Sequence, residues 1–204
     1  MTSGPDHYFT AVPASPEELR SRTVSLAGRD VTVTTAGGVF SPDGLDKGTR
    51  VLLDRVPDPP DTGTFLDLGC GWGPLALTMA LLSPEATVHA VDVNRRALDL
   101  ARRNAADLGC HRVVVGTPDD VDDAVRFDLI WSNPPIRVGK AVLHELLTTW
   151  LPRLAPGGTA YLVVQRNLGS DSLQAWLGRT LPDLETSRHS SAKGFRVLQV
   201  HRPA

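Results

Sequence analysis

Three glycines placed between a strand pattern and a helix pattern constrain the fold of this chain more than any other feature. The apolar run Thr64–Leu68 predicts a buried strand, and Pro74–Leu82 predicts a helix with a proline in its first turn. Gly69, Gly71 and Gly73 lie between them. Glycine permits positive φ and lets another group approach the backbone, which a Cβ would prevent. The sequence therefore predicts a strand–turn–helix unit with an open turn.

The chain after residue 63 continues this alternation of strand and helix patterns. Further strands are predicted at Thr87–Val91, His111–Val115, Phe127–Ser132 and Ala160–Val164, and helices at Arg95–Leu108, Ala141–Leu154 and Ser172–Arg179. The last two strand patterns, Leu184–Arg188 and Phe195–His201, have no helix between them, so we expect the last strand to run antiparallel. We predict an α/β protein with a doubly wound, Rossmann-like sheet of about seven strands.

A proline-rich polar stretch at residues 57–63 predicts a boundary between two parts of the chain. We expect an N-terminal extension over residues 1–56 and the main domain over residues 57–204. Within the extension, the alternating runs Thr23–Leu26 and Val31–Thr35 predict a β-hairpin, and Leu45–Arg55 predicts a short helix.

Composition and charge exclude several classes of protein. The 204 residues include 21 Lys and Arg, 23 Asp and Glu and two cysteines, and the net charge is −2. This balance gives no overall positive field to attract nucleic acid, and two cysteines cannot form a disulfide framework. No apolar run approaches the roughly 18 residues of a membrane span, and the first residues lack the regions of a secretory signal. We therefore expect a cytoplasmic protein. The histidines show no spacing typical of metal ligands, so we expect no metal.

Two carboxylates near the glycine turn indicate a cofactor and its charge. Asp92 follows the strand Thr87–Val91, where a carboxylate can accept hydrogen bonds from both hydroxyls of an adenosine ribose. Asp67 precedes the first glycine by two residues, and there it would repel a pyrophosphate but attract a cation. The acid therefore favours S-adenosylmethionine, which carries an ammonium and a sulfonium, over NAD.

An asparagine and two prolines, Asn133, Pro134 and Pro135, follow the strand Phe127–Ser132. An exocyclic amine is a poor nucleophile because its lone pair is delocalised. The side-chain oxygen of Asn133 and the carbonyl of Pro134 can each accept one of its hydrogens, and the lone pair then points at a methyl group. We expect the prolines to leave this carbonyl without a competing local N–H, and we predict that these three residues are catalytic.

Together, these motifs resemble those of a class I methyltransferase that acts on amino nitrogen. The resemblance narrows to the single-domain members of the small-subunit ribosomal RNA guanine-N2 methyltransferases through His7–Phe9, Gly38–Thr49, Asn133–Lys140 and Gly194–Leu198. It implies that S-adenosylmethionine binds at Asp67, Gly69, Gly71 and Asp92, and that the segment Phe40–Thr49 closes over the site as a lid. We expect the cofactor contacts to be completed by Phe40, Thr49, Trp72, Val93 and Asn94.

The chain departs from the family pattern at two positions. Many relatives carry an aromatic residue after the prolines, on which the target base stacks, whereas this chain has Ile136. Because base–aromatic stacking contributes about 1–3 kcal/mol, another ring must help or the base is held more weakly, and the candidates are Phe40, Tyr8 and Phe195. Relatives also often place an acid after the third strand for the adenine amino group, and whether Asp119 takes that role is open.

Five cationic residues are expected at the edge where the predicted site lies: Arg137, Lys140 and Arg166 follow strands, and Lys193 and Arg196 lie in the final hairpin turn. We expect them to contact RNA phosphates around a flipped nucleotide, with Ile136 and Phe195 also on the substrate side. The alternative is an ordinary solvated surface.

We therefore predict methyl transfer from S-adenosylmethionine to the exocyclic N2 amine of a guanine in small-subunit ribosomal RNA, presented as RNA or as the small subunit. Three alternatives remain open. The same turn could orient adenine N6 or a protein glutamine amide, or the chain could bind the cofactor without catalysis. A dinucleotide oxidoreductase is the third, and Asp67 argues against it.

Overall fold

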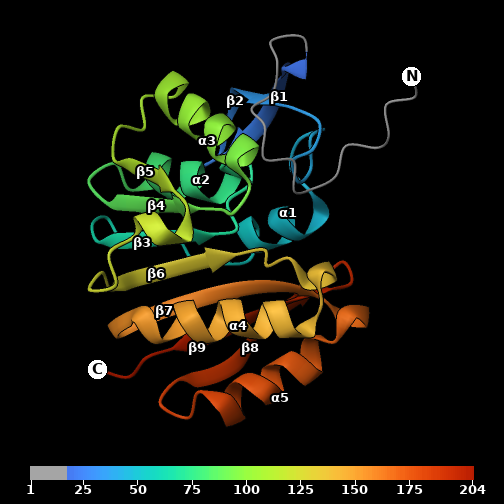
Figure 1. Cartoon of the computed structure of the whole chain (residues 1–204), viewed down its shortest axis with the longest axis vertical. Helices are drawn as coiled ribbons and strands as arrows, with labels where there is room; N and C mark the ends of the chain where they lie inside the picture. The colour runs from blue at the N-terminus through green and yellow to red at the C-terminus, as the bar shows by residue number, and fades with distance from the viewer. Residues whose placement is uncertain (1–17) are drawn as a thin grey trace.

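A computed structural model describes residues 18–204, and in this part of the chain a seven-stranded sheet lies beside a separate two-stranded hairpin (Figure 1). The strand order of the large sheet is β5-β4-β3-β6-β7-β9-β8. Its strands are β3 (Thr64–Leu68), β4 (Thr87–Val91), β5 (Val113–Gly116), β6 (Phe127–Ser132), β7 (Leu154–Gln165), β8 (Glu185–Ala192) and β9 (Phe195–His201). Within this sheet, β9 alone runs in the direction opposite to the other six strands. The prediction of a doubly wound α/β sheet with an antiparallel last strand is confirmed.

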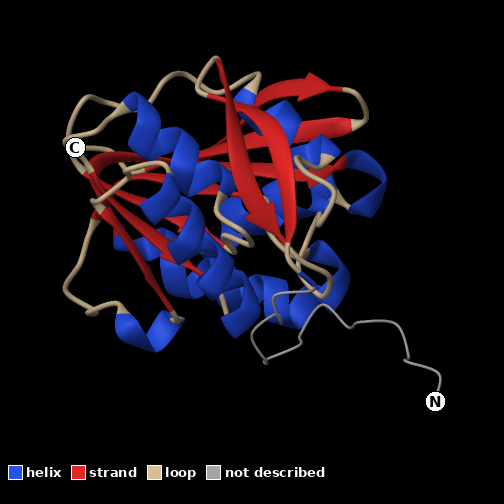
Figure 2. Cartoon of the chain, turned by 90° about the horizontal axis from the view of Figure 1, so that it is seen from above, coloured by secondary structure: helices blue, strands red, loops and turns tan. Residues whose placement is uncertain are grey.

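Helices cover both faces of the sheet (Figure 2). They are α1 (Lys47–Leu53), α2 (Pro74–Leu82), α3 (Arg95–Asp107), α4 (Lys140–Trp150) and α5 (Ser170–Thr180). The first three pack with the hairpin on one face, and α4 and α5 pack on the other. Side chains of a strand alternate between faces, so Trp131 of β6 joins the first core while Ile130 joins the second. None of the helices in the described residues is long and apolar enough to cross a membrane.

The predicted hairpin is confirmed, and its strands β1 (Arg20–Leu26) and β2 (Arg29–Thr35) are longer than expected. Ala27 and Gly28 form a two-residue turn with φ of 50° and 72°, which matches the twist of a tight hairpin. A side chain of α3 holds the hairpin in place, because Asn104 accepts from the Thr34 N–H at 2.7 Å and donates to the Thr34 carbonyl at 3.0 Å. The boundary between residues 1–56 and 57–204 stays a prediction.

The predicted helix Ala141–Leu154 is wrong at its C-terminal end. Helix α4 ends at Trp150, and residues Ala155–Gly158, which lie between the predicted helix and the predicted strand Ala160–Val164, belong to β7. Gly157 and Gly158 pair with Arg202 through backbone hydrogen bonds of 2.8 and 3.0 Å. A Cβ on Gly158 would lie 2.7 Å from the Phe127 carbonyl, so here glycine permits a close strand approach instead of ending a strand.

Candidate active site

The strand order reverses between β3 and β6, and the predicted site lies at the carboxyl ends of these two strands. Leu68 is paired with Ser132, and the Ser132 hydroxyl donates to the Leu68 carbonyl at 2.7 Å. The residues that follow, the glycine turn and Asn133, are therefore neighbours across the sheet. In open α/β sheets this is the crevice where ligands bind. A single cavity is lined by both of them and by residues of the segment Phe40–Thr49.

The glycine turn leaves open space beside the backbone. Gly69 and Gly71 have φ of 79° and 56°, and a Cβ built on either of them meets no atom within 4 Å. Trp72 is almost fully buried and lines the same cavity, and its carbonyl accepts from Asn104 at 3.0 Å. The turn is thus an uncrowded cradle with a fixed backbone, as the sequence pattern requires for a bound ligand.

Asp67 is fully buried, and only one of its carboxyl oxygens has a partner in the described part of the chain. Its Oδ2 accepts from the backbone N–H of Ala76 in the first turn of α2 at 2.8 Å, whereas Oδ1 is buried and unpaired. Burial, with the nearby charge of Asp92 adding to it, raises the pKa of Asp67 to about 8. A buried carboxyl with an unused oxygen at the cavity wall suits a cationic ligand, which would restore its ionised form.

Asp92 lies one residue after β4 and its oxygens accept backbone hydrogen bonds. Oδ2 accepts from the Gly71 N–H at 2.9 Å and Oδ1 from the Asn94 N–H at 2.8 Å. Burial raises the pKa of Asp92, and these two hydrogen bonds partly offset the rise. Asn94 caps α3 and donates to the Gly38 carbonyl at 3.0 Å, while the neighbouring Val93 is exposed. Each carboxylate oxygen can accept a second hydrogen bond, so the geometry remains compatible with a ribose.

The carboxamide of Asn133 is held in one orientation by two residues of the segment Phe40–Thr49. Its Nδ2 donates to Asp46 Oδ2 at 2.7 Å and to Thr49 Oγ1 at 3.1 Å. The Thr49 hydroxyl donates its hydrogen to Asp46 Oδ2 at 2.6 Å, so toward Asn133 it can only accept a hydrogen bond. Because both partners accept hydrogen bonds from it, the amide atom that faces them is the NH₂ nitrogen. Among residues 18–204 nothing donates to its Oδ1, which is left as an acceptor.

One expectation about the prolines is wrong. The Pro134 carbonyl was expected to have no competing local N–H, but it accepts from the Ile136 N–H at 2.8 Å. Pro135, with φ −74° and ψ 75°, forms an inverse γ-turn that makes this contact. A carbonyl oxygen has two lone pairs, so one remains for a ligand. Ile136 is half-buried and packs against the core under α4, and its predicted place on the substrate side stays a prediction.

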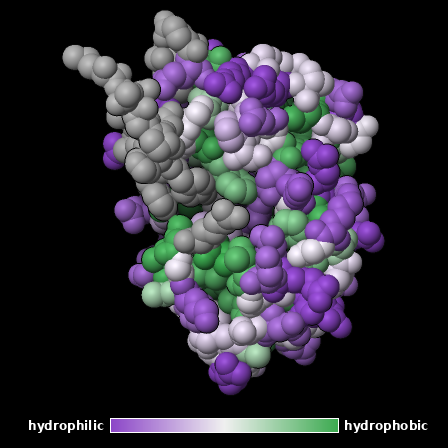
Figure 3. Space-filling view, turned by 90° about the vertical axis from the view of Figure 1, so that its right-hand side faces the viewer, coloured by the Kyte–Doolittle hydropathy of each residue, from purple (hydrophilic) through white to green (hydrophobic). Residues whose placement is uncertain are grey.

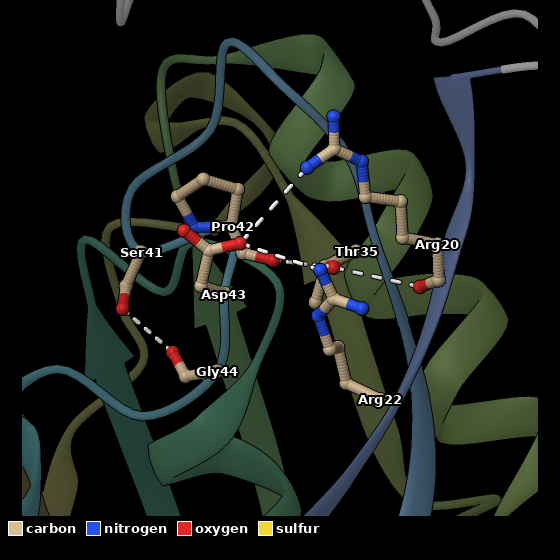
Figure 4. Close-up of polar contacts among 7 residues, drawn as sticks. All are labelled: Arg20, Arg22, Thr35, Ser41, Pro42, Asp43 and Gly44. Atoms are coloured by element: carbon tan, nitrogen blue, oxygen red, sulfur yellow. Dashed lines mark hydrogen bonds and ion pairs between the residues drawn. The ribbon is translucent and has the colours of Figure 1, made fainter.

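The segment that covers the cavity is tied to the hairpin (Figure 4), and the residues just before it are tied to α3. Asp43 Oδ1 lies 3.9 Å from a guanidinium nitrogen of Arg20 and 3.3 Å from one of Arg22. The Thr35 hydroxyl donates to the Pro42 carbonyl at 2.6 Å. From the other side, the buried Arg96 of α3 donates to the Gly37 carbonyl at 2.8 Å.

Two rings are candidates for the substrate side. Phe40 is exposed and lines the cavity. Phe195 of β9 is half-buried, and a Cβ on Gly48 would lie 3.2 Å from both its Cε1 and the Asn133 Nδ2, so the ring and the amide flank the same glycine. Tyr8, with the rest of His7–Phe9, lies outside the described residues.

The cationic residues lie at the expected edge but are not equally available. Lys140 and Arg166 are exposed, at the start of α4 and just after β7. Lys193, in the β8–β9 turn, is exposed and lies 3.7 Å from Asp54. Arg196 differs from the expectation of a solvent-facing cation, because it pairs with Asp171 and is largely buried. Arg137 lies in a 3₁₀ turn after Pro135. Figure 3 shows the side toward which β6 points, where a hydrophobic area is bordered by hydrophilic residues.

Two residues of the site were missed by the sequence analysis. Asp46 holds Asn133, and its signal is an N-cap pattern: an acid, then Thr49 three residues later, ahead of an apolar run. Asn104, which binds both the hairpin and the glycine turn, carries no such signal. Asp119 is exposed in a 3₁₀ turn after β5, and its predicted contact stays open. In residues 18–204 no group of three metal-ligating side chains comes together.

A doubly wound sheet with an open glycine turn, two buried acids and a tethered asparagine at the strand reversal defines a class I methyltransferase. The sequence matches the family described as Methyltransferase small domain over residues 30–199, and the chain belongs to this family. The predictions of a methyltransferase and of S-adenosylmethionine as its cofactor are confirmed.

Several relatives can be compared over their lengths. An uncharacterized Bacillus subtilis protein, YbxB, is 35% identical over 200 residues, which cover 97% of this chain and 98% of that protein. Ribosomal RNA small subunit methyltransferase C of Shewanella halifaxensis is 31% identical over 78% of this chain and 48% of its own length. Ribosomal RNA large subunit methyltransferase G of Ectopseudomonas mendocina is 34% identical over 83% and 46%.

Among solved structures, the T. thermophilus 16S rRNA N2 methyltransferase, in complex with AdoMet and guanosine, superposes with a TM-score of 0.76. It is 24% identical and covers 93% of this chain and 52% of that one. The chain thus spans about half the length of the ribosomal RNA methyltransferases that it matches.

Proposed function

We propose that the protein transfers a methyl group from S-adenosylmethionine to the exocyclic N2 amine of a guanine in small-subunit ribosomal RNA. The observation that carries this proposal is the carboxamide of Asn133, whose NH₂ is bound by Asp46 and Thr49 so that Oδ1 is left to accept from an amine. The relatives named as small subunit methyltransferase C, and the guanosine in the T. thermophilus structure, support guanine as the base.

The charges around the cavity suit the cofactor, whereas the enclosed volume of about 20 Å³ is much smaller than the molecule, so binding requires the cavity to open. The unpaired Oδ1 of Asp67 would bind the ammonium of its amino acid end, and Asp92 would bind the ribose hydroxyls. The space beside Gly69 and Gly71 would admit the cofactor to the backbone, with Phe40 and Trp72 beside it. When bound, S-adenosylmethionine supplies an electrophilic methyl group on sulfur and leaves as a neutral thioether.

The residues at the strand reversal act on the amine. Asn133 Oδ1 and the remaining lone pair of Pro134 would each accept one N–H, so that the nitrogen lone pair is directed at the methyl carbon. The methyl group would pass from sulfur to this nitrogen, and the electron pair of the broken carbon–sulfur bond would stay on sulfur. The nitrogen becomes cationic, and its proton is lost to water. No strong base is needed, since the positively charged amine is a strong acid.

Substrate binding would use the ring and the cations at the same edge. Phe195 lies beside the amide and offers a face for the base. Lys140, Arg166 and Lys193 would contact phosphates, together with Arg137, whereas Arg196 is engaged with Asp171. We further propose that residues 1–56 form an extension that closes over the main domain of residues 57–204.

A second candidate keeps the chemistry and changes the RNA. The relative named large subunit methyltransferase G matches a similar share of this chain, so a guanine of large-subunit RNA is the main competitor. Adenine N6 and a protein glutamine amide present the same kind of flat NH₂ group and compete as substrates. A cofactor-binding role without catalysis competes with all of these reactions.

One experiment separates these candidates. Small subunits, large subunits, both naked RNAs and a glutamine peptide are incubated with the protein and isotopically labelled S-adenosylmethionine, and the products are identified by nucleoside mass spectrometry. We expect N2-methylguanosine in small-subunit RNA only, and its loss with Asn133→Ala. A label found in large-subunit RNA, in adenine or in the peptide would replace this proposal, and cofactor binding without any product would reject catalysis.

A further inference from the structure

We propose that Asp46 is a positioning residue, which sets the direction of the Asn133 carboxamide and so decides whether the site presents an acceptor or a donor to the amine. The proposal rests on the function proposed above and assigns a role to Asp46, which lines the same cavity and for which no direct contact to cofactor or substrate is proposed. Asp46 lies 87 residues before Asn133, at the start of α1.

One carboxylate serves both the helix and the asparagine. Asp46 Oδ1 accepts from the Gly48 N–H at 2.6 Å, which caps α1. Its Oδ2 accepts from the Thr49 hydroxyl at 2.6 Å and from Asn133 Nδ2 at 2.7 Å. The Asp46 side chain is therefore oriented by the helix start, and it transfers that orientation to Asn133.

The chemistry of the two partners permits one direction only. An ionised carboxylate accepts hydrogen bonds and cannot donate, so Asn133 must turn its NH₂ toward Asp46. If the Asn133 carboxamide were reversed, its oxygen would face the Asp46 carboxylate and the two would repel each other. Its NH₂ would then face the substrate amine, and two hydrogen-bond donors would oppose each other. Thr49, whose proton is used on Asp46, imposes the same direction.

The packing around Gly48 keeps this contact short. A Cβ at residue 48 would lie 3.2 Å from Asn133 Nδ2, from Asp46 Oδ1 and from Phe195 Cε1. The helix start, the asparagine and the ring thus meet at a residue without a side chain. Because Asp46 belongs to the segment Phe40–Thr49, the acceptor is correctly directed only when this segment is seated on the site.

The test exchanges the two side chains. Asp46→Asn retains a good N-cap and nearly the same shape, but its NH₂ would turn Asn133 around. Asn133→Asp would set two carboxylates against each other. In the double variant Asp46→Asn, Asn133→Asp the new amide donates to the new carboxylate, whose other oxygen again faces the amine. We expect each single variant to lower kcat about a hundredfold or more, and the double variant to recover at least about tenfold over either.

Three controls make the result specific. Asp58→Asn removes an exposed carboxylate outside the site, and we expect its kcat to stay within about twofold of wild type. The dissociation constant for S-adenosylmethionine should change by less than about threefold in Asp46→Asn, because the lesion is in the amine acceptor. Asp46→Ser, which caps a helix but is too short to reach Asn133, should lose activity like Asp46→Asn, and it replaces that variant if the latter fails to fold.

A readout without RNA separates this proposal from the proposed function. The side-chain NH₂ of Asn133 gives a proton–nitrogen NMR signal, which is assigned by its loss in Asn133→Asp. We expect slow hydrogen exchange for it in the wild type and fast exchange in Asp46→Ser. If the wild type methylates no RNA but shows this protected amide, the substrate is wrong and the positioning stands. An unprotected wild-type amide, full kcat in Asp46→Asn, or a double variant no better than the single ones would overturn the positioning role.

Discussion

The buried Asp67 should make the stability of the cofactor-free protein depend on pH in a way that its amide analogue does not. Its pKa is about 8 in the folded chain against an ordinary value of 3.8. Between these values the folded state binds one proton more than the unfolded state, so the free energy of unfolding falls as pH rises. Each pH unit in this window corresponds to about 1.4 kcal/mol, which gives a loss of about 2 kcal/mol between about pH 6 and 7.5.

Asp67→Asn provides the reference, because an amide oxygen can still accept from the Ala76 N–H while the side chain no longer titrates. Urea unfolding of both proteins without cofactor, across this pH range, measures the difference. Asp92 is present in both proteins, so its own titration largely cancels. A difference curve that is flat to within about 0.5 kcal/mol would refute the assignment of a protonated Asp67.

The same carboxyl links pH to cofactor binding. A cation beside Oδ1 favours the ionised form, so binding below about pH 8 should release close to one proton from Asp67. Calorimetry in buffers of different ionisation enthalpy counts this proton. The affinity of the wild type should rise with pH up to about 8, whereas Asp67→Asn should bind more weakly and show no such rise.

Two further predictions concern space and stacking. Gly71→Ala should lower the free energy of unfolding by about 1–2 kcal/mol because the φ of Gly71 is 56°. It should also lower cofactor affinity, because the added methyl group enters the cradle. The control Gly28→Ala, at a φ of 72° in the hairpin turn, should cost similar stability and leave cofactor affinity unchanged. Equal cofactor affinity in the two variants, measured by calorimetry, would contradict the cradle. Phe195→Leu should raise KM for RNA roughly 5- to 150-fold, the equivalent of about 1–3 kcal/mol of stacking, with an unchanged dissociation constant for the cofactor. An unchanged KM would leave Phe40 and Tyr8 as the candidate rings.

The sequence predicts well those features that depend on the pattern of a few neighbouring residues. Strand β6 and helix α2 were predicted to the residue, because apolar runs and a proline at the helix start are visible in a few neighbouring positions. The C-terminal end of the predicted helix Ala141–Leu154 was wrong because Ala155–Gly158 belong to β7, where Gly158 permits a close approach to Phe127 of β6. Nothing in the local sequence distinguishes a glycine used in this way from one in a turn. Arg196 was placed on the correct edge, but its partner Asp171 comes from another element.

The contacts that complete the site could not be predicted, because they join parts of the chain that only the fold brings together. Residues 37–49 touch both halves of the crevice: the Gly38 carbonyl accepts from Asn94, next to the acid proposed for the ribose, and Asp46 holds Asn133. The glycine turn and Asn133 are fixed by the β3–β6 register whether or not this segment is in place. Displacing the segment would therefore leave the crevice intact but remove the partner that directs the amide. It follows that cofactor binding and methyl transfer should respond differently to changes in this segment, with the transfer step the more sensitive of the two.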